Sequence, residues 1–450
     1  MLITISGKSY GISVRSVKMQ KANARWYKLD NAAKIYPVVY SKTNSGTFIV
    51  AANLYEPVIP KLLQDAINKL LPRFPMFRVK LKKGLFWYYL NYNYKPFIIK
   101  PATDDFCGHI RNNNDYLFEV LYRNNTITLH IFHSLTDGTG AITFLKSIVY
   151  KYLNLKGYQL TPDNLIITEQ SVPTGAELED SYLKYYNKSN RKTEKERLAF
   201  QIKGEPLNFG GTGAILGWLK TSQLHDLAKT NNATITAYLT AVIIYSIYQT
   251  QIKGRTFIKE STRPVKVLVP VNLRIRMFSL TLRNFAGFIK VGMQLNRENI
   301  TFEEILQTVK NQLTEQINTA AYSKYANSYV YFEKNFFLRI CPLVLKNLII
   351  KLAYHFIGNR LNTVQFSNLG VISFPESVQP YIKSIQCALG ASKTSLLNCM
   401  ACSYLDEFNI TFSRFIAEKD IERECFRFLT TNNLNITIES NYMEQQNEIL

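Results

Sequence analysis

The stretch TITLHIFHSLTDGTG, residues 126–140, combines an apolar strand pattern, a short turn and the start of a helix pattern. Residues 126–132 are rich in β-branched and aromatic side chains and predict a strand. Apolar residues then recur at helical spacing from about 140 to 153. A strand that leads through a turn into a helix is typical of α/β folds, which expose reactive groups at strand ends. His133 lies at that end, so it is a candidate functional residue.

His133 is one of five histidines, and its surroundings set it apart from the others. Asp137 lies four positions on and is followed at once by Gly138, which permits a tight backbone. A carboxylate there can pair with a cation elsewhere in the fold and so fix the imidazole. A neutral imidazole can remove a proton from a hydroxyl or amine that attacks a carbonyl. A lone histidine is more often structural, however, so the residues alone leave both roles open.

Strand and helix patterns alternate on both sides of this stretch, which predicts an α/β fold. Before it, we expect strands at 46–54, 77–81, 85–90 and 116–122 and a helix at 59–71. After it, we expect strands at 215–219, 265–271, 285–291, 363–366, 384–389, 396–404, 409–415 and 434–438 and helices at 222–229, 234–248, 301–321, 337–357 and around 421–429. The charged stretch 187–205 is the best candidate for a linker. The predicted division is therefore an N-terminal lobe at 1–190, a linker at 191–206 and a C-terminal lobe at 207–450.

The length and charge of the chain narrow the classes of partner. With 450 residues, of which 46% are apolar, two packed domains are expected. The net charge of +21 is spread along the whole chain, without a compact basic block. This distribution argues against a nucleic-acid reader and favours a general positive field that attracts a polyanionic small molecule.

The six scattered cysteines and the apolar segments help to predict where in the cell the protein is located. Cys399 and Cys402 form a C-x-x-C without a second pair or a histidine at ligand spacing, so we predict no metal site and reduced, structural cysteines. The N-terminus lacks the pattern of a signal peptide, and a cytoplasmic location is expected. The apolar stretches 237–248 and 336–357 predict buried or amphipathic helices rather than membrane spans. For the second stretch, weak association with a membrane surface is an alternative.

The segment HSLTDG, residues 133–138, resembles the H-x-x-x-D-G signature of the chloramphenicol acetyltransferase-like superfamily. Further similarities follow in the same order along residues 20 to 440. Two of them, WYKLDNAAKIYP at 26–37 and RFPMFR at 73–78, resemble bacterial alcohol acetyltransferase-like members. The segment VPVNLRIR at 269–276 is similar to a V-D-x-R-x-R strand of plant members. The segment QFSNLG at 365–370 resembles an S-N-x-G crossover. The chain is most similar to alcohol acetyltransferase-like and condensation-domain-like proteins.

The resemblance implies two chloramphenicol acetyltransferase-like α/β sandwich lobes with an active-site tunnel between them. His133 would be the general base, Asp137 would form a structural salt bridge with Arg274 or, as second choice, Arg276, and Gly138 would allow the turn. Ser367 and Asn368 would line the tunnel, with Asn368 near the developing oxyanion. The implied activity is transfer of an acyl group, most simply acetyl, from coenzyme A to a small alcohol or amine. It needs acyl-CoA as cosubstrate, no bound cofactor, no metal and no covalent acyl-enzyme, and we expect a monomer.

Three departures leave alternatives open. Phe132 replaces the first histidine of the pair common in condensation domains, Asn272 replaces the aspartate of the V-D-x-R-x-R strand, and the D-F-G-W-G loop of plant members has no counterpart. These differences argue against the plant branch. A condensation-like enzyme that uses a carrier-protein thioester, and a non-catalytic member that binds a small molecule or a partner in the same cleft, remain alternative hypotheses.

Overall fold

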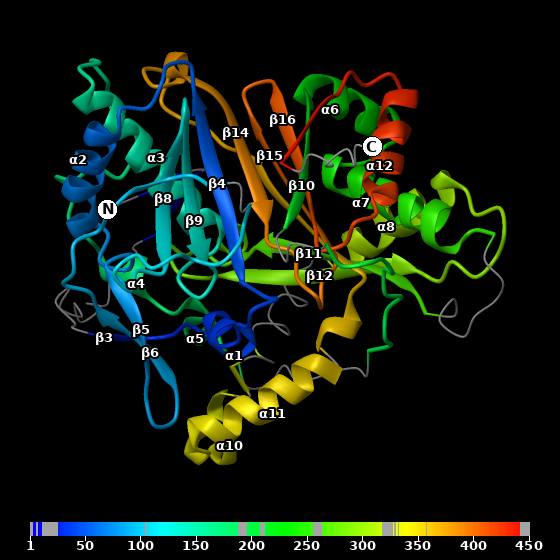
Figure 1. The fold of residues 1–450 in the computed structure, drawn as a ribbon, viewed down its shortest axis with the longest axis horizontal. Helices are drawn as coiled ribbons and strands as arrows, with labels where there is room; N and C mark the ends of the chain where they lie inside the picture. Colours follow the sequence, from blue (N-terminus) through cyan, green and yellow to red (C-terminus); the bar gives the residue numbers. More distant parts are fainter. Residues whose placement is uncertain are drawn as a thin grey trace, which may run out of the picture.

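The structure, a computed structural model, describes residues 3–5, 8–10, 26–103, 106–187, 196–207, 212–254, 263–316, 327, 330–331, 333–356 and 358–441. Two mixed β-sheets with helices packed on them form its two lobes (Figure 1). The predicted α/β fold is therefore confirmed.

The N-terminal lobe is built on a five-stranded sheet in the order β14-β4-β9-β8-β7. Its strands are β4 (Thr47–Leu54), β7 (Lys100–Pro101), β8 (Phe118–Arg123), β9 (Thr126–Phe132) and β14 (Ile382–Leu389). Helix α3 (Gly138–Leu155) packs on β4 and β9, and α2 (Pro60–Leu70) packs on α3. Apolar residues of both helices are buried against the sheet. This packing holds the turn between β9 and α3, which carries His133, at the end of the sheet.

The C-terminal lobe is built on a seven-stranded sheet in the order β12-β11-β13-β15-β16-β10-β17. Its strands are β10 (Gly213–Lys220), β11 (Val265–Asn272), β12 (Ala286–Met293), β13 (Val364–Val371), β15 (Leu397–Tyr404), β16 (Glu407–Arg414) and β17 (Thr437–Ser440). Its helices are α6 (Thr221–Thr230), α7 (Ile235–Ile247), α8 (Phe302–Gln316) and α12 (Asp420–Thr431). The apolar helix α7 is buried between this sheet and the helices α8 and α12, as its lack of a polar face predicts.

The two lobes exchange parts of the chain. Strand β14 lies within the predicted C-terminal lobe but pairs with β4, so that it completes the N-terminal sheet. In the other direction, the loop between β11 and β12 reaches the start of α3. The predicted division at 191–206 did not anticipate this exchange, because strand pairing between distant segments leaves no local pattern. Residues 191–195 of that linker lie outside the described residues, and 196–206 contain no helix or strand.

The strand β15 explains the C-x-x-C motif. Side chains alternate between the two faces of a strand, so residues three positions apart face opposite ways. Cys399 packs into the core of the C-terminal lobe, whereas Cys402 packs into the core shared with β14. Neither cysteine is part of a disulfide. The two cysteines of the motif therefore pack in different hydrophobic cores and do not form a redox pair.

A small sheet and two helices form the base of the molecule in Figure 1. The sheet contains β3 (Trp26–Lys28), β6 (Tyr88–Tyr92) and β5 (Val79–Lys83) in that order. Where one helix was predicted at 337–357, the structure has α10 (Phe336–Ile340) and α11 (Leu343–Phe356). The break falls at Pro342, since proline cannot continue a helix from the preceding turn. Neither of these helices, nor any other in the described part of the chain, has the length and apolar character needed to cross a bilayer.

The remaining elements are short. They are β1 (Ile3–Ile5), β2 (Lys8–Tyr10), α1 (Tyr36–Val39), α4 (Gly175–Leu178), α5 (Ser181–Lys184), the 3₁₀ turns Ala32–Lys34, Leu71–Arg73, Leu273–Ile275, Gly358–Leu361 and Gln379–Tyr381, and the π-helical turn Tyr248–Ile252. The predicted helix 301–321 is seen to Gln316, and 317–321 lie outside the described residues. The last predicted strand, 434–438, is observed at Thr437–Ser440, so it begins three residues later and ends two residues later.

Candidate active site

His133 follows β9 directly and is held on three sides. Its backbone N–H donates to the carbonyl oxygen of Gly46 over 2.9 Å. The imidazole stacks on the ring of Tyr36, with centroids 4.6 Å apart and an interplanar angle of 7°, and the ring of Phe48 lies at 4.9 Å. The side chain remains partly exposed to a large cavity. These contacts fix the plane of the imidazole and leave one edge free to meet a ligand.

Asn284, from the loop between β11 and β12, sets the tautomer of His133. The Nδ1 atom of His133 lies 3.1 Å from Oδ1 of Asn284, and Nδ2 of Asn284 donates to Oδ2 of Asp30 over 3.2 Å. The backbone N–H of Ala33 and the guanidinium of Arg283 also face the Asp30 carboxylate, so this group acts as an acceptor. An amide oxygen accepts but never donates, so Nδ1 of His133 carries the hydrogen. In the neutral imidazole, Nε2 therefore keeps its lone pair.

Burial keeps this imidazole neutral at neutral pH. Burial lowers the pKa of His133 below its ordinary value of 6.5, while hydrogen bonds and the carboxylates of Asp137 and Asp30 oppose this only in part. A neutral imidazole with a free Nε2 can accept a proton at neutral pH. His133 can therefore act as a base in the cavity.

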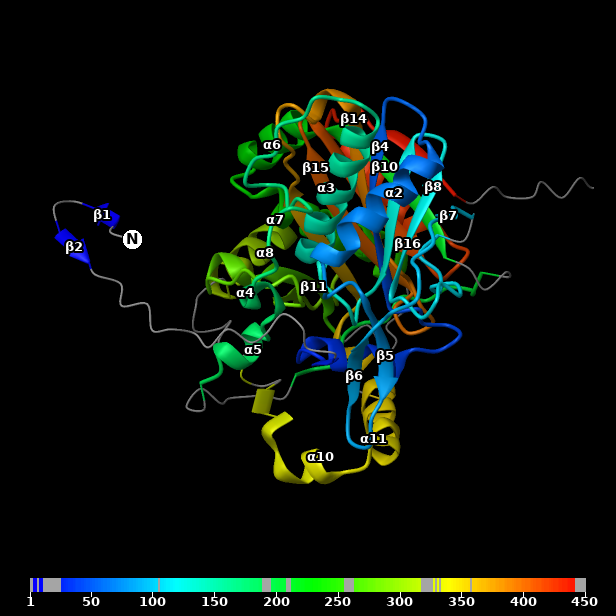
Figure 2. The same ribbon diagram turned by 90° about the vertical axis from the view of Figure 1, so that its left-hand side faces the viewer.

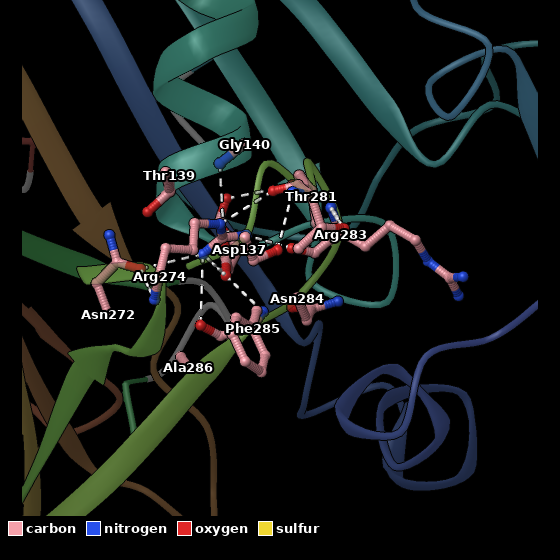
Figure 3. Close-up of polar contacts among 12 residues, drawn as sticks. Asp137, Thr139, Gly140, Asn272, Arg274, Thr281, Arg283, Asn284, Phe285 and Ala286 are labelled. Carbon is pink, nitrogen blue, oxygen red and sulfur yellow. Dashed lines mark hydrogen bonds and ion pairs between the residues drawn. The ribbon is translucent and has the colours of Figure 1, made fainter. Parts of the chain in front are cut away.

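Asp137 forms the N-cap of α3 and pairs with Arg274 (Figure 3). The guanidinium donates to both carboxylate oxygens, over 2.8 and 3.1 Å, and both side chains are almost fully buried. Asp137 also accepts from the backbone N–H groups of Gly140 and Phe285. Arg276, the second candidate partner, is exposed instead. Asp137 thus joins the start of α3 to the loop that carries Asn284.

Two glycines at the start of α3 differ in their surroundings. Gly138 was expected to allow the turn, but it is the first residue of the helix and lacks a positive φ. A Cβ at Gly138 would lie 2.6 Å from Leu369, at the end of a flexible side chain. At Gly140 it would lie 2.3 Å from the backbone oxygen of Leu282, and 2.1 Å from the hydroxyl of Thr136. The backbone of Leu282 therefore comes so close to Gly140 that only glycine fits there. The sequence did not single out this position.

A cavity of about 1370 Å³ opens between the two lobes. His133, Gly138, Ser367 and Asn368 all line it. The amide of Asn368 donates to Thr236 over 3.0 Å, and its oxygen accepts from the N–H of Gly370. The hydroxyl of Ser367 forms no hydrogen bond with any residue that the structure describes. Ser367 therefore has a free hydroxyl in the same cavity as the candidate base.

The cavity is also lined by basic side chains. Lys34 and Lys290 form ion pairs with Glu333 and Glu196. Lys393 and Arg360 are exposed and have no ion-pair partner within the described parts of the chain. Two uncompensated positive charges at the exposed edge of the cavity can bind the phosphates of an anionic ligand.

Asn284 and the role of Asp30 were missed by the sequence analysis. Asp30 lies within the quoted stretch 26–37, and Asn284 lies one residue before the predicted strand 285–291. A polar residue beside an apolar strand is too common to be a signal on its own. Asn284 is recognised as a candidate functional residue only because the fold places its side chain opposite the His133 ring.

No protein-family model and no curated protein matches this sequence. The fold, in contrast, matches many solved structures. The polyketide synthase associated protein 5 of Mycobacterium tuberculosis is 16% identical, with a TM-score of 0.58 over 90% of this chain and 97% of that one. The trichothecene 15-O-acetyltransferase of Fusarium sporotrichioides is 12% identical, with a TM-score of 0.59 over 90% and 94%.

A third similar structure comes from Fusarium sporotrichioides and is a complex with coenzyme A and T-2. It is 10% identical, with a TM-score of 0.62 over 93% of this chain and all of that one. Likeness at such low identity establishes the fold. The chain therefore has the two-lobed fold of these structures, which is the fold that the resemblance of its H-x-x-x-D-G segment implied.

Proposed function

We propose that this protein is an acyltransferase that moves an acyl group, most simply acetyl, from coenzyme A to an alcohol or amine. The observation that carries the proposal is the hydrogen-bonded series His133–Asn284–Asp30, from which we infer that Nδ1 of the neutral His133 carries the hydrogen and Nε2 is unprotonated. The imidazole is neutral at neutral pH and lines a cavity large enough for two substrates. The fold is shared with a trichothecene 15-O-acetyltransferase and with a protein that binds coenzyme A, which supports this class of reaction.

In the proposed reaction, Nε2 of His133 removes the proton of the acceptor as its oxygen or nitrogen attacks the thioester carbonyl. The tetrahedral oxyanion needs a hydrogen-bond donor, and the free hydroxyl of Ser367 and the remaining N–H of Asn368 are the candidates in the cavity. Collapse of the intermediate breaks the C–S bond, and the imidazolium returns its proton to the departing thiolate. Both substrates are bound together, and no covalent acyl-enzyme forms.

The proposed cosubstrate carries several negative charges. Lys393 and Arg360 are suited to its phosphates, because neither charge is compensated by an acid in the described residues. Apolar residues such as Tyr36, Leu369 and Met400 line other parts of the same cavity and suit an apolar acyl group or acceptor. No bound cofactor is needed for this chemistry.

Release of free thiol from acetyl-CoA in the presence of a panel of alcohols and amines tests the proposal. We expect turnover by the wild type and a loss of about 10³-fold in His133→Ala, with an unchanged circular dichroism spectrum. His225→Ala is the matched control, since this exposed histidine on α6 does not line the cavity. Near-normal turnover in His133→Ala would overturn the assignment of the base.

A second donor in the same assay addresses the condensation-like alternative. Turnover with an acyl-carrier thioester, but not with acetyl-CoA, would replace coenzyme A as the donor and keep the role of His133. Absence of turnover with both donors across the panel would favour a binding protein over an enzyme.

A further inference from the structure

The helix α11 turns its apolar side outward. Val344 is 84% exposed, and Leu345, Leu348, Ile349 and Leu352 are each about half exposed. These positions recur at intervals of three and four and lie on one face of the helix. The inward side carries the buried Lys346 and the partly buried Asn347 beside the apolar Leu343 and Ile350. A surface helix ordinarily has the opposite arrangement, with its polar face in water.

Neighbouring elements extend this apolar face. In α10, Phe336, Phe337 and Ile340 are all more than half exposed, with Phe337 at 76%. At the tip of the β5–β6 hairpin, Leu85 and Phe86 are also exposed. Figure 2 shows this hairpin reaching the same end of the molecule as α10 and α11. We call these ten residues of α10, α11 and the hairpin tip the basal face.

Specific contacts hold the hairpin tip and α11 together. The N–H of Leu343 donates to the carbonyl oxygen of Leu85 over 2.8 Å, and Nζ of Lys346 donates to that of Phe86 over 2.8 Å. Nζ of Lys346 also lies 3.4 Å from the centre of the Trp87 ring. The polar side of α11 is thus used for attachment, and this leaves its apolar side in solvent. The inward side also reaches the cavity of His133, which is lined by Leu343, Lys346 and Asn347.

The charge around the basal face is mainly positive, and the nearby acids Glu333 and Asp115 are paired with Lys34 and Lys95. Residues 78–95 and 334–360 contain five Lys or Arg each and no Asp or Glu. Seven of these cations are exposed, namely Lys82, Lys83, Lys95, Lys334, Arg339, Lys351 and Arg360, and Lys95 among them pairs with Asp115. Apolar and aromatic side chains bordered by lysine and arginine are the composition of segments that lie in the interface of an anionic bilayer.

We propose that the basal face docks the protein on an anionic membrane surface, with the apolar side chains of α10, α11 and the hairpin tip inserted among the lipids. A contiguous apolar patch of this extent on a soluble surface marks an interaction site. A symmetric dimer through this face would bring lysine and arginine against lysine and arginine, with no acid in either segment to compensate them. The charge complements phosphatidylserine and not a second copy of the chain.

Flotation with vesicles of phosphatidylserine and phosphatidylcholine tests the docking, with phosphatidylcholine vesicles for comparison. The variant Phe337→Gln/Val344→Gln removes two highly exposed apolar groups and should leave the core intact. Tyr55→Gln/Leu405→Gln is the matched control. Both of its side chains are about 60% exposed, and they follow β4 and β15 at the opposite end of the molecule in Figure 1. Lys82→Glu/Lys83→Glu probes the charge without changing an apolar residue.

We expect the wild type and the control variant to float with the anionic vesicles and much less with pure phosphatidylcholine. The partition coefficient of Phe337→Gln/Val344→Gln should be at least about tenfold lower, and Lys82→Glu/Lys83→Glu should lose most of the dependence on anionic lipid. Because the assay contains no thioester, its result is independent of the proposed acyl transfer.

Three results would overturn membrane docking. The first is a wild type that does not float with anionic vesicles, and the second is equal flotation of Phe337→Gln/Val344→Gln and the wild type. The third is a wild-type dimer in light scattering that this variant converts to a monomer, since the basal face would then join two copies of the chain.

Discussion

The Nδ1 atom of His133 lies 3.1 Å from the side-chain oxygen of Asn284, a residue 151 positions later in the chain. His133 belongs to the N-terminal lobe, whereas Asn284 belongs to the loop between β11 and β12 of the C-terminal lobe. The state of the candidate base therefore depends on the correct docking of the two lobes. Asp137 and Arg274 make the same connection a few residues away.

Removal of the Asn284 side chain should lower kcat about tenfold or more and leave KM for the acceptor nearly unchanged. Without Asn284, Nδ1 of His133 loses its acceptor, and the tautomer with a free Nε2 is no longer favoured. The hydrogen bond that His133 donates to Asn284 raises the pKa of His133, so Asn284→Ala should also move the acid limb of the pH profile to lower pH. A merely structural role would lower stability without this shift.

The pH profile of the wild type should show an acid limb with its midpoint below 6.5. Burial lowers the pKa of His133, so the neutral, active form persists below the pH at which a free histidine titrates. At pH values between the pKa of His133 in the folded protein and the ordinary value of 6.5, the unfolded chain binds more protons than the folded chain. Stability should therefore rise with pH through this window, and His133→Ala should lose that dependence. A midpoint of kcat/KM above 7 would contradict this assignment.

Loss of the Asp137 carboxylate should destabilise the fold strongly. Asp137→Ala would leave the buried Arg274 unpaired and the first turn of α3 uncapped, at a cost of about 3 kcal/mol in the free energy of unfolding. Urea denaturation measures this change. The double variant Asp137→Ala/Arg274→Ala should lose less than the sum of the two single variants, because it leaves no buried charge. An Asp137→Ala protein as stable as the wild type would remove Asp137 from its structural role.

The two glycines of α3 offer a matched pair of variants. Gly140→Ala should cost about 2 kcal/mol, since its Cβ would collide with the backbone oxygen of Leu282. In Gly138→Ala the collision is with the mobile end of Leu369, and the gain in helix propensity of about 1 kcal/mol offsets part of it. In thermal unfolding, the melting temperature of Gly140→Ala should therefore be well below that of Gly138→Ala. The reverse order would contradict the packing described for this turn.

Lys393→Ala should raise KM for acetyl-CoA about threefold to tenfold with little change in kcat. An exposed cation contributes modestly to the binding of a phosphate, and salt should reduce the difference between variant and wild type. Lys61→Ala on α2 is the control, because this exposed lysine does not line the cavity. Equal KM values for both variants would exclude Lys393 from the phosphate site.

Most of the fold could be predicted because its elements leave local patterns in the chain. The strand at Thr126–Phe132, the helix at Gly138–Leu155 and the buried helix at Ile235–Ile247 each follow from apolar spacing over a few turns or residue pairs. The short motif around His133 and Asp137 also pointed to the superfamily fold that the solved structures confirm.

Other features depended on pairings across long separations, which periodicity does not encode. The insertion of β14 beside β4, the placement of Asn284 between His133 and Asp30 and the strict need for glycine at position 140 arise where segments of the two lobes meet. The outward apolar side of α11 likewise follows from the hydrogen bonds of Lys346 and Asn347 with the β5–β6 hairpin, which turn these polar side chains inward. Local residue patterns determine which elements form, whereas burial and hydrogen bonding between distant elements decide which of their side chains meet.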